Sequence, residues 1–295
     1  MTVRKIAVLF AAALAVTGCA DDGAAPDGAD GRAALAAALG GVEGGNYTFT
    51  RAGFAAAEGS VELPGSFLIE QEYGPSVLRA GDAYHLRYRI HGDAHDQWAK
   101  LLAEPAAGVK PAELKAAQTV MKHLDGEQWV RADEKRLRAA AAAEDISGME
   151  NLPASPTTAA PDVTGASALV GAVVDASKDG STVTGTLDAT TVDPELRLFH
   201  NDPYYFYGPK AKAVPFEATL DDQGRLTRIA VRVPGMLEAP ASVDPQAFPS
   251  AAPTSEPNPE LVIAISLYGG TAAQAAPDAP VLVDDAYEAL TNDTD

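Results

Sequence analysis

The stretch Tyr84-His85-Leu86-Arg87-Tyr88-Arg89-Ile90-His91 decides the fold class, because apolar and polar side chains alternate along it without a break. One face holds Tyr84, Leu86, Tyr88 and Ile90, and the other holds His85, Arg87, Arg89 and His91. Alternation with a period of two is typical of a β-strand that has one face buried and one in water. The stretch therefore predicts a sheet that is covered on one side.

Similar patterns elsewhere predict the rest of this sheet. Strands are expected at residues 47–50, 66–72, 127–131, 181–188, 214–221, 226–233 and 261–268, with a last edge strand at 281–283. The sequence Asp221-Asp222-Gln223-Gly224 predicts a hairpin turn in which Gly224 supplies a positive φ. One apolar face and one polar face describe an antiparallel sheet.

Alanine-rich segments between the strands are the natural cover for its apolar face. Helices are expected at residues 30–40, 111–124, 133–144 and 167–176, and loops at 146–161 and 234–259. In the first helix Asp30 is the expected cap and Gly40 the expected end, and Leu35 and Leu39 share one face. The predicted class is α+β.

The first eighteen residues have the organisation of an export signal. Arg4 and Lys5 precede an apolar run of eleven residues, 6–16, which is too short to span a bilayer as a mature helix. The segment Val16-Thr17-Gly18-Cys19 resembles the bacterial lipobox, in which the cysteine receives a diacylglyceryl group and becomes the first mature residue. Two acyl chains, such as palmitate, give a stable membrane anchor.

The chain then divides into three parts. Residues 1–18 are the expected lipoprotein signal peptide, residues 19–31 a disordered polar tether, and residues 32–295 a single domain. Cys19 is the only cysteine, so no internal disulfide is expected. The location predicted by this start is the outer face of the cell membrane, with the membrane itself as a partner through Cys19.

The charge of the chain excludes some partners. The formal net charge is −19, and 46% of the residues are hydrophobic. An acidic surface argues against nucleic-acid binding, which needs Lys and Arg to neutralise phosphates, and against electrostatic docking on anionic lipid.

The order of these segments resembles a known family. A lipobox, a polar tether, a short Ala/Leu helix and the strand Tyr47-Thr48-Phe49-Thr50 open the chain; Trp129-Val130-Arg131, the hairpin at 214–234 and the strand at 261–270 follow. This arrangement resembles actinobacterial envelope lipoproteins of the LppX/LprG type, which are related in fold to the carrier LolA. The resemblance implies a strongly curved antiparallel sheet, or half-barrel, with helices across its concave face and acyl chains between the two layers.

The resemblance and the strand pattern together define a candidate apolar pocket. Its expected lining is Leu35, Leu39, Phe67, Ile69, Leu86, Tyr88, Ile229, Val231, Ile263 and Ile265. Small alanine side chains in the helices either leave part of this surface unfilled or let the helices pack closer with no cavity. Both alternatives stay open on the sequence alone.

Densely spaced aromatic residues at 199–208 form a second candidate feature. They either pack a loop onto the sheet edge, or Tyr204, Tyr205, Phe206 and Tyr207 form the rim of an apolar mouth.

Catalytic chemistry finds little support in the sequence. His91 and His95 stand four apart near carboxylates, but Gly92 is expected to break a helix there, so a solvated loop is favoured over a metal site. His123 and His200 are expected at the surface. The chain has no Gly-x-Ser-x-Gly elbow and no phosphate-binding loop, so neither an enzyme nor a cofactor is expected.

Two functions follow as hypotheses. The first is a membrane-anchored envelope lipoprotein that binds or carries a lipid-like ligand between sheet and helices. The alternative is a tethered module that docks an envelope protein or regulates it and binds no small molecule.

Overall fold

The computed structural model describes residues 29–142, 149–237 and 260–291. The strands are β1 Asn46–Ala52, β2 Ala57–Glu62, β3 Ser66–Gln71, β4 Ser76–Ala80, β5 Ala83–Arg87, β6 Val130–Arg131, β7 Val173–Asp179, β8 Thr182–Leu187, β9 Val214–Leu220, β10 Leu226–Val231 and β11 Leu261–Ser266. The α-helices are α1 Ala29–Ala38, α2 Gly40–Glu43, α3 Gly92–Ala103, α4 Pro111–His123, α5 Glu134–Ala141, α6 Ala166–Gly171, α7 Pro203–Tyr207 and α8 Asp284–Leu290. Short 3₁₀ turns are η1 Met149–Asn151, η2 Ala189–Thr191, η3 Pro194–Leu196 and η4 Gly208–Lys212.

All eleven strands form one open antiparallel sheet in the order β6-β5-β4-β3-β2-β1-β11-β10-β9-β8-β7. Strands that follow one another in sequence pair, which builds one meander from β1 to β6 and another from β7 to β10. Most of them are joined by short turns, but residues 88–129, with α3 and α4, separate β5 from β6, and residues 188–213 separate β8 from β9. The last strand, β11, joins the two by pairing with both β1 and β10. The predicted α+β class with a curved antiparallel sheet is confirmed.

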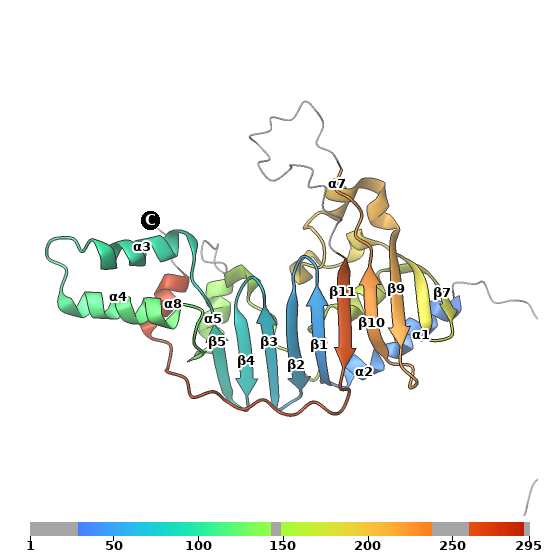
Figure 1. The fold of residues 1–295 in the computed structure, drawn as a ribbon, viewed down its shortest axis with the longest axis horizontal. Helices are drawn as coiled ribbons and strands as arrows, with labels where there is room; N and C mark the ends of the chain where they lie inside the picture. The colour runs from blue at the N-terminus through green and yellow to red at the C-terminus, as the bar shows by residue number, and fades with distance from the viewer. Residues whose placement is uncertain (1–28, 143–148, 238–259, 292–295) are drawn as a thin grey trace, which may run out of the picture.

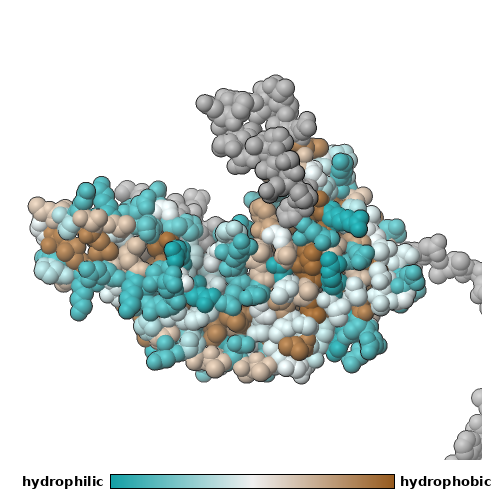
Figure 2. All heavy atoms as spheres, viewed as in Figure 1, coloured by the Kyte–Doolittle hydropathy of each residue, from teal (hydrophilic) through white to brown (hydrophobic). Residues whose placement is uncertain are grey.

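Helices cover one face of the sheet and leave the other open. In Figure 1 α1, α2 and α5 lie behind the strands, while α3 and α4 extend sideways beyond β5. We call the covered face the inner face and the opposite one the outer face. Figure 2 shows mostly hydrophilic and neutral side chains on the outer face, which points toward the viewer.

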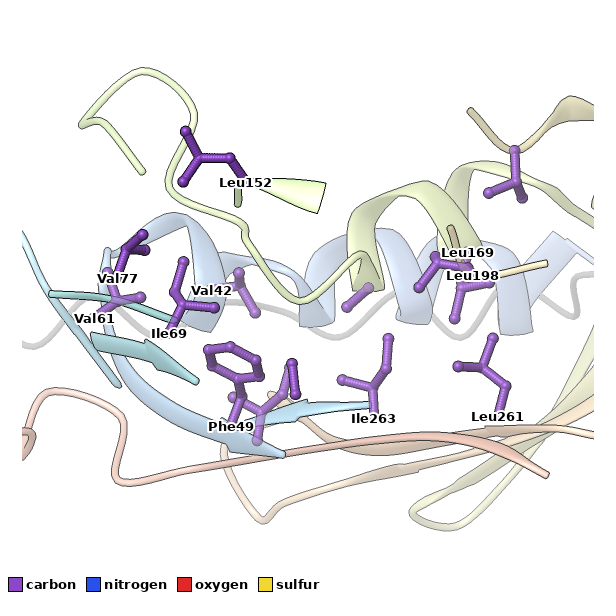
Figure 3. Close-up of a cluster of buried hydrophobic side chains, with 14 of the residues drawn as sticks. Val42, Phe49, Val61, Ile69, Val77, Leu152, Leu169, Leu198, Leu261 and Ile263 are labelled. Atoms are coloured by element: carbon purple, nitrogen blue, oxygen red, sulfur yellow. The ribbon is translucent and has the colours of Figure 1, made fainter. Parts of the chain in front are cut away.

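The hydrophobic core lies between the inner face and its helical cover. Figure 3 shows Phe49 and Ile263 pointing up from the strands toward Val42 and Leu169, which come from the covering segments. All four side chains are at most 3% exposed. Period-two alternation in the strands thus places the apolar residues on one face, as the sequence predicts.

Two glycines permit close contacts in this layer. A Cβ on Gly31 would lie 2.6 Å from the carbonyl oxygen of Ala176, so glycine lets α1 pack directly on β7. A Cβ on Gly59 would lie 2.8 Å from the ring of Phe49, so glycine leaves room for that ring on the inner face.

A C-terminal strap, residues 267–283, runs along one end of the strands from β11 back to β6 (Figure 1). Along the way the Gln274 backbone N–H donates to Ser66 Oγ at 2.8 Å, and its side-chain amide donates to Ser60 Oγ at 2.9 Å. The strap then forms a parallel bridge between Val281 and Arg131. A single bridge and the helix α8 therefore replace the edge strand predicted at 281–283.

Several predicted elements are confirmed within a few residues. The helices at 111–124 and 133–144 appear as α4 and α5, and Asp133 caps α5 by accepting a hydrogen bond from the Arg136 N–H. In the β9–β10 hairpin Gly224 has φ +75°, as expected. The first helix begins at Ala29, so the expected tether loses its last three residues to α1; Asp30 lies within the first turn rather than at the cap.

Other predictions were wrong for local reasons. The segment 167–176 is not one helix: α6 ends at Gly171, and the β-branched Val173 and Val174 begin the edge strand β7. The strand predicted at 84–91 ends at Arg87, although Tyr88 and Ile90 stay buried. The strand predicted at 127–131 shrinks to the two residues of β6.

Gly92 does not break a helix but begins one. It has φ +64° after an extended His91, and this turn starts α3, which the sequence did not predict. The expected solvated loop at 91–96 is therefore mostly helical, although Asp93 and Asp96 are exposed as expected.

Candidate functional site

The ten predicted pocket residues come together in a single hydrophobic cluster. Leu35 comes from α1, Leu39 follows it directly, and the others come from β3, β5, β10, β11 and the residue after β5. None of the ten is more than 9% exposed. The inner face is therefore one continuous apolar surface on which bulky side chains from the sheet meet a small number of leucines from the cover.

Among the hollows at the surface of the described part of the chain are two whose linings include none of the ten residues. The larger, about 400 Å³, lies where β1, β2, β3 and β5 reach the α7 side of the sheet. Its lining is Thr50, Arg51, Ala52, Ala56, Ala57, Glu58, Glu70, Gln71, Glu72 and Arg87. The smaller, about 260 Å³, lies along α3 beside Asp93, Asp96, Gln97 and Lys100.

Arg51 is the unusual member of the larger hollow, because it follows Tyr47 and Phe49 on the inner face of β1. Its Nε donates to the Ala55 carbonyl at 2.6 Å and its Nη1 donates to the Thr164 carbonyl at 3.3 Å. Burial lowers the pKa of Arg51 to about 10, while the nearby Asp162 carboxylate opposes this shift. The positively charged guanidinium of Arg51 therefore lies where the apolar interior meets the hollow.

The loop that faces Arg51 is held by a compact set of hydrogen bonds. Asp162 accepts from the Thr164 N–H and from the Ser167 N–H, each at 2.7 Å, which starts α6. Tyr47 Oη donates to the Pro161 carbonyl at 2.7 Å and accepts from the Val163 N–H at 3.2 Å. Burial raises the pKa of Tyr47 above its ordinary value, so this phenol stays neutral.

The aromatic segment at 199–208 forms the short helix α7 rather than a loop. The Asp202 carboxylate caps it by accepting from the Tyr205 N–H at 3.0 Å. Tyr207 is 4% exposed and packs into the core, Phe206 is partly buried, and Tyr204 and Tyr205 are 51% and 59% exposed. The inner two rim candidates thus anchor the helix, and the outer two project from it.

This aromatic helix adjoins the larger hollow through the β1–β2 turn. The Phe54 ring in that turn lies 4.7 Å from the His200 ring, which stacks at 4.3 Å on Phe206. Residues on both sides of Phe54 line the hollow. The sequence feature that could have drawn attention to Phe54 is its position as a large apolar residue in a short turn between two strands.

The expectation of surface histidines was wrong for His123 and His200. His123 is 7% exposed on the inner side of α4, and His200 is half-buried in its aromatic stack. Burial lowers the pKa of both imidazoles. His85, predicted on the polar face, is 2% exposed because it lies between Leu78 of β4 and Arg131 of β6 in the sheet register.

Some predicted features lie outside the described residues or are tested only in part. Cys19, the signal peptide and most of the loop at 234–259 fall outside the described ranges. Within those ranges no group of three His, Cys, Asp or Glu side chains is placed to hold a metal ion. No helix in the described part of the chain has both the length and the apolar character needed to cross a membrane.

The fold and this geometry define an α+β protein built on one open, curved antiparallel sheet with a helix-covered apolar face. The crystal structure of LprF from Mycobacterium bovis is similar to it, with 11% sequence identity, a TM-score of 0.37, and coverage of 84% of this chain and 97% of that one. Similarity at this level carries no argument about function. No family model and no curated protein matches the chain.

Proposed function

We propose that this protein is an exported lipoprotein, anchored to the outer face of the cell membrane through Cys19, that binds a lipid-like apolar ligand between its sheet and its helices. The observation that carries the proposal is the inner face. It is apolar across both meanders, and only short helices and a loop cover it, rather than a second sheet.

The cover has features that favour entry of a ligand. The helix α1 has the sequence ADGRAALAAA, in which six of the ten residues are alanine, and α6 has only six residues. Layers held together by small side chains bury less apolar area than layers of leucine and phenylalanine, so their separation costs less free energy.

The larger hollow is the proposed entrance to this interior. It lies at the ends of the strands, where the inward-facing Ala57 and Arg51 meet outer-face side chains such as Glu58, Glu70 and Arg87. Arg51 gives this end of an otherwise apolar interior a positive charge. Arg87 and the three glutamates Glu58, Glu70 and Glu72 also line the hollow, so an amphiphile would place its polar head among these charged side chains and its chain along the inner face.

The proposal assigns binding rather than catalysis to this protein. The proposed site combines the apolar inner face with a polar hollow that holds Arg51, Arg87 and three glutamates, and two backbone carbonyls hold Arg51 in place. Neither a nucleophile nor a general base is assigned to it.

Anchoring is tested by replacement of Cys19. The variant Cys19→Ala removes the sulfur that would carry the diacylglyceryl group, so it is expected to stay uncleaved or to leave the membrane fraction. Cell fractionation and the intact mass of the protein measure this. An unchanged mass and an unchanged membrane fraction would overturn the anchor.

Ligand binding is tested on the chain from residue 19 with Cys19→Ser, purified without detergent. Organic extraction followed by mass spectrometry is expected to release one amphiphile per protein. If the extract contains no amphiphile and added fatty acids do not bind, the alternative function applies, which is a tethered protein-docking or regulatory module without a small ligand.

A further inference from the structure

Exposed apolar side chains are concentrated at one place on the described surface. The described part of the chain has nine large hydrophobic residues that are exposed, and five of them lie around α7. This α7 patch consists of Phe54 (48% exposed), Tyr204 (51%), Tyr205 (59%), Met236 (45%) and Leu237 (56%). Figure 1 shows α7 standing above the ends of β9, β10 and β11.

The α7 patch is held in place by the fold. The His200 ring stacks on Phe206 at 4.3 Å and lies tilted against Phe54 at 4.7 Å between ring centroids. The Leu237 N–H donates to the Phe206 carbonyl at 2.7 Å, which ties the end of the β10 extension to α7. These contacts hold Phe54 and Leu237 beside α7.

The charge around the patch differs from that of the chain. The segments that form it, 53–57, 199–213 and 233–237, contain one acidic residue, Asp202, and two basic ones, Lys210 and Lys212. Their sum is +1, whereas the chain carries −19. The Lys212 Nζ lies 5.8 Å from the Tyr204 ring. The patch is therefore free of the acidic excess that would repel phospholipid headgroups.

Tyrosines with exposed phenol groups, flanked by lysines and backed by aliphatic side chains, are the residues enriched where proteins meet the headgroup layer of a bilayer. We propose that the α7 patch docks on the lipid surface itself, so that the larger hollow opens beside the membrane. The composition favours lipid over a protein partner, since the apolar centre is small, two tyrosines present their phenol groups, and two lysines lie beside it.

The length of chain between Cys19 and α1 agrees with this placement. This step rests on the proposed anchoring at Cys19. Nine residues lie between Cys19 and Ala29, where α1 begins, so the ten Cα–Cα steps span at most ~35 Å. The helix α1 packs on β7, in the same half of the sheet as the strands below α7.

Vesicle binding by the unlipidated chain tests the proposal separately from the anchor. The chain from residue 19 with Cys19→Ser is floated with vesicles of phosphatidylcholine and phosphatidylglycerol. The double variant Tyr204→Ser/Tyr205→Ser is expected to lower the vesicle-bound fraction at least fivefold. Val174→Ser is the matched control, because Val174 is 53% exposed on β7 away from the patch, and it is expected to bind as the parent does.

A second readout uses the absence of any other cysteine. In the Cys19→Ser background, Tyr205→Cys and Val174→Cys each carry one environment-sensitive fluorophore. Vesicles are expected to shift the emission of the label at 205 to the blue and to leave the label at 174 unchanged. Equal responses at both positions, no vesicle binding, or unchanged vesicle binding by Tyr204→Ser/Tyr205→Ser would each overturn the proposal.

Discussion

The inner and outer faces of the sheet are built from the same strands, but the inner face carries buried apolar side chains and the outer face carries polar ones. On the inner face, Phe49 and Ile263 are buried against the helical cover. On the outer face, Thr48 Oγ1 and Ser266 Oγ pair at 2.8 Å across β1 and β11, and Glu70 pairs with Arg87. The difference shows that alternation alone determines which face needs a cover.

Both faces have exceptions to this pattern. On the inner face Arg79, which lies between Phe67 and Tyr84 in the sheet register, pairs with Glu134 of α5. Arg51 enters the inner face at its end, beside the loop that Asp162 orders. His85 is buried on the outer face between two neighbouring strands, and its Nδ1 has no hydrogen-bond partner in the described part of the chain. Substitutions on the two faces and at these exceptions test the contrast between the faces.

The largest expected effect is the loss of a bulky inner-face side chain. Phe67→Ala removes a ring that is 1% exposed, so the free energy of unfolding is expected to fall by ~3–5 kcal/mol. Leu68→Ala, one residue along on the outer face and half-buried, is expected to cost less than half as much. Denaturant unfolding measures both, and equal losses would contradict the assignment of the faces.

A smaller effect is expected from Arg51. Arg51→Met keeps the aliphatic stem but leaves the carbonyls of Ala55 and Thr164 without their donor, so it is expected to cost ~1–3 kcal/mol. Arg89→Met is the matched control, because Arg89 makes an exposed ion pair with Glu127 at 2.9 Å, and such pairs contribute ~0–1 kcal/mol. Equal costs for the two variants would show that Arg51 is not anchored as described.

The third expected effect is a pH dependence from the buried histidines. Burial lowers the pKa of His85 and of His123, with Arg131 adding to the shift at His85 and Lys122 adding to it at His123. The unfolded chain then binds more protons below pH ~6.5, so stability is complete above that pH and falls as the pH drops, by at most ~1.4 kcal/mol per pH unit for each histidine.

The variant His85→Gln separates this effect from carboxylate titration. It is expected to flatten the dependence of unfolding free energy on pH between 6.5 and 5. A slope identical to that of the parent protein would mean that His85 does not contribute.

Sequence patterns predicted the inner face well because strong alternation marks β3, β5, β9, β10 and β11. They missed β2, whose inner positions are Ala57, Gly59 and Val61, because two of these three have little or no side chain. They also read Val173 and Ala176 as helical, since Leu169, Val173 and Ala176 fit a helical period as well as a strand. The hollow beside Arg51 brings together four strand ends, and no local pattern indicates such an assembly.

The aromatic helix shows the same limit. The aromatic composition of residues 199–208 marked them as a candidate feature. Their contact with Phe54, however, depends on how β1 pairs with β11 and β11 with β10. Pairing over such separations is a property of the folded sheet.

The most direct test of ligand binding between the layers is a titration with a fluorescent long-chain fatty acid. The unlipidated parent is compared with Ala57→Phe, which fills the inner face beside the hollow, and with Ala52→Phe, which enlarges an exposed residue of the same hollow. Circular dichroism checks that both variants fold. We predict saturable binding at one site, at least tenfold weaker in Ala57→Phe and retained in Ala52→Phe; absence of saturable binding by the parent, or equal affinity in all three, would contradict the account.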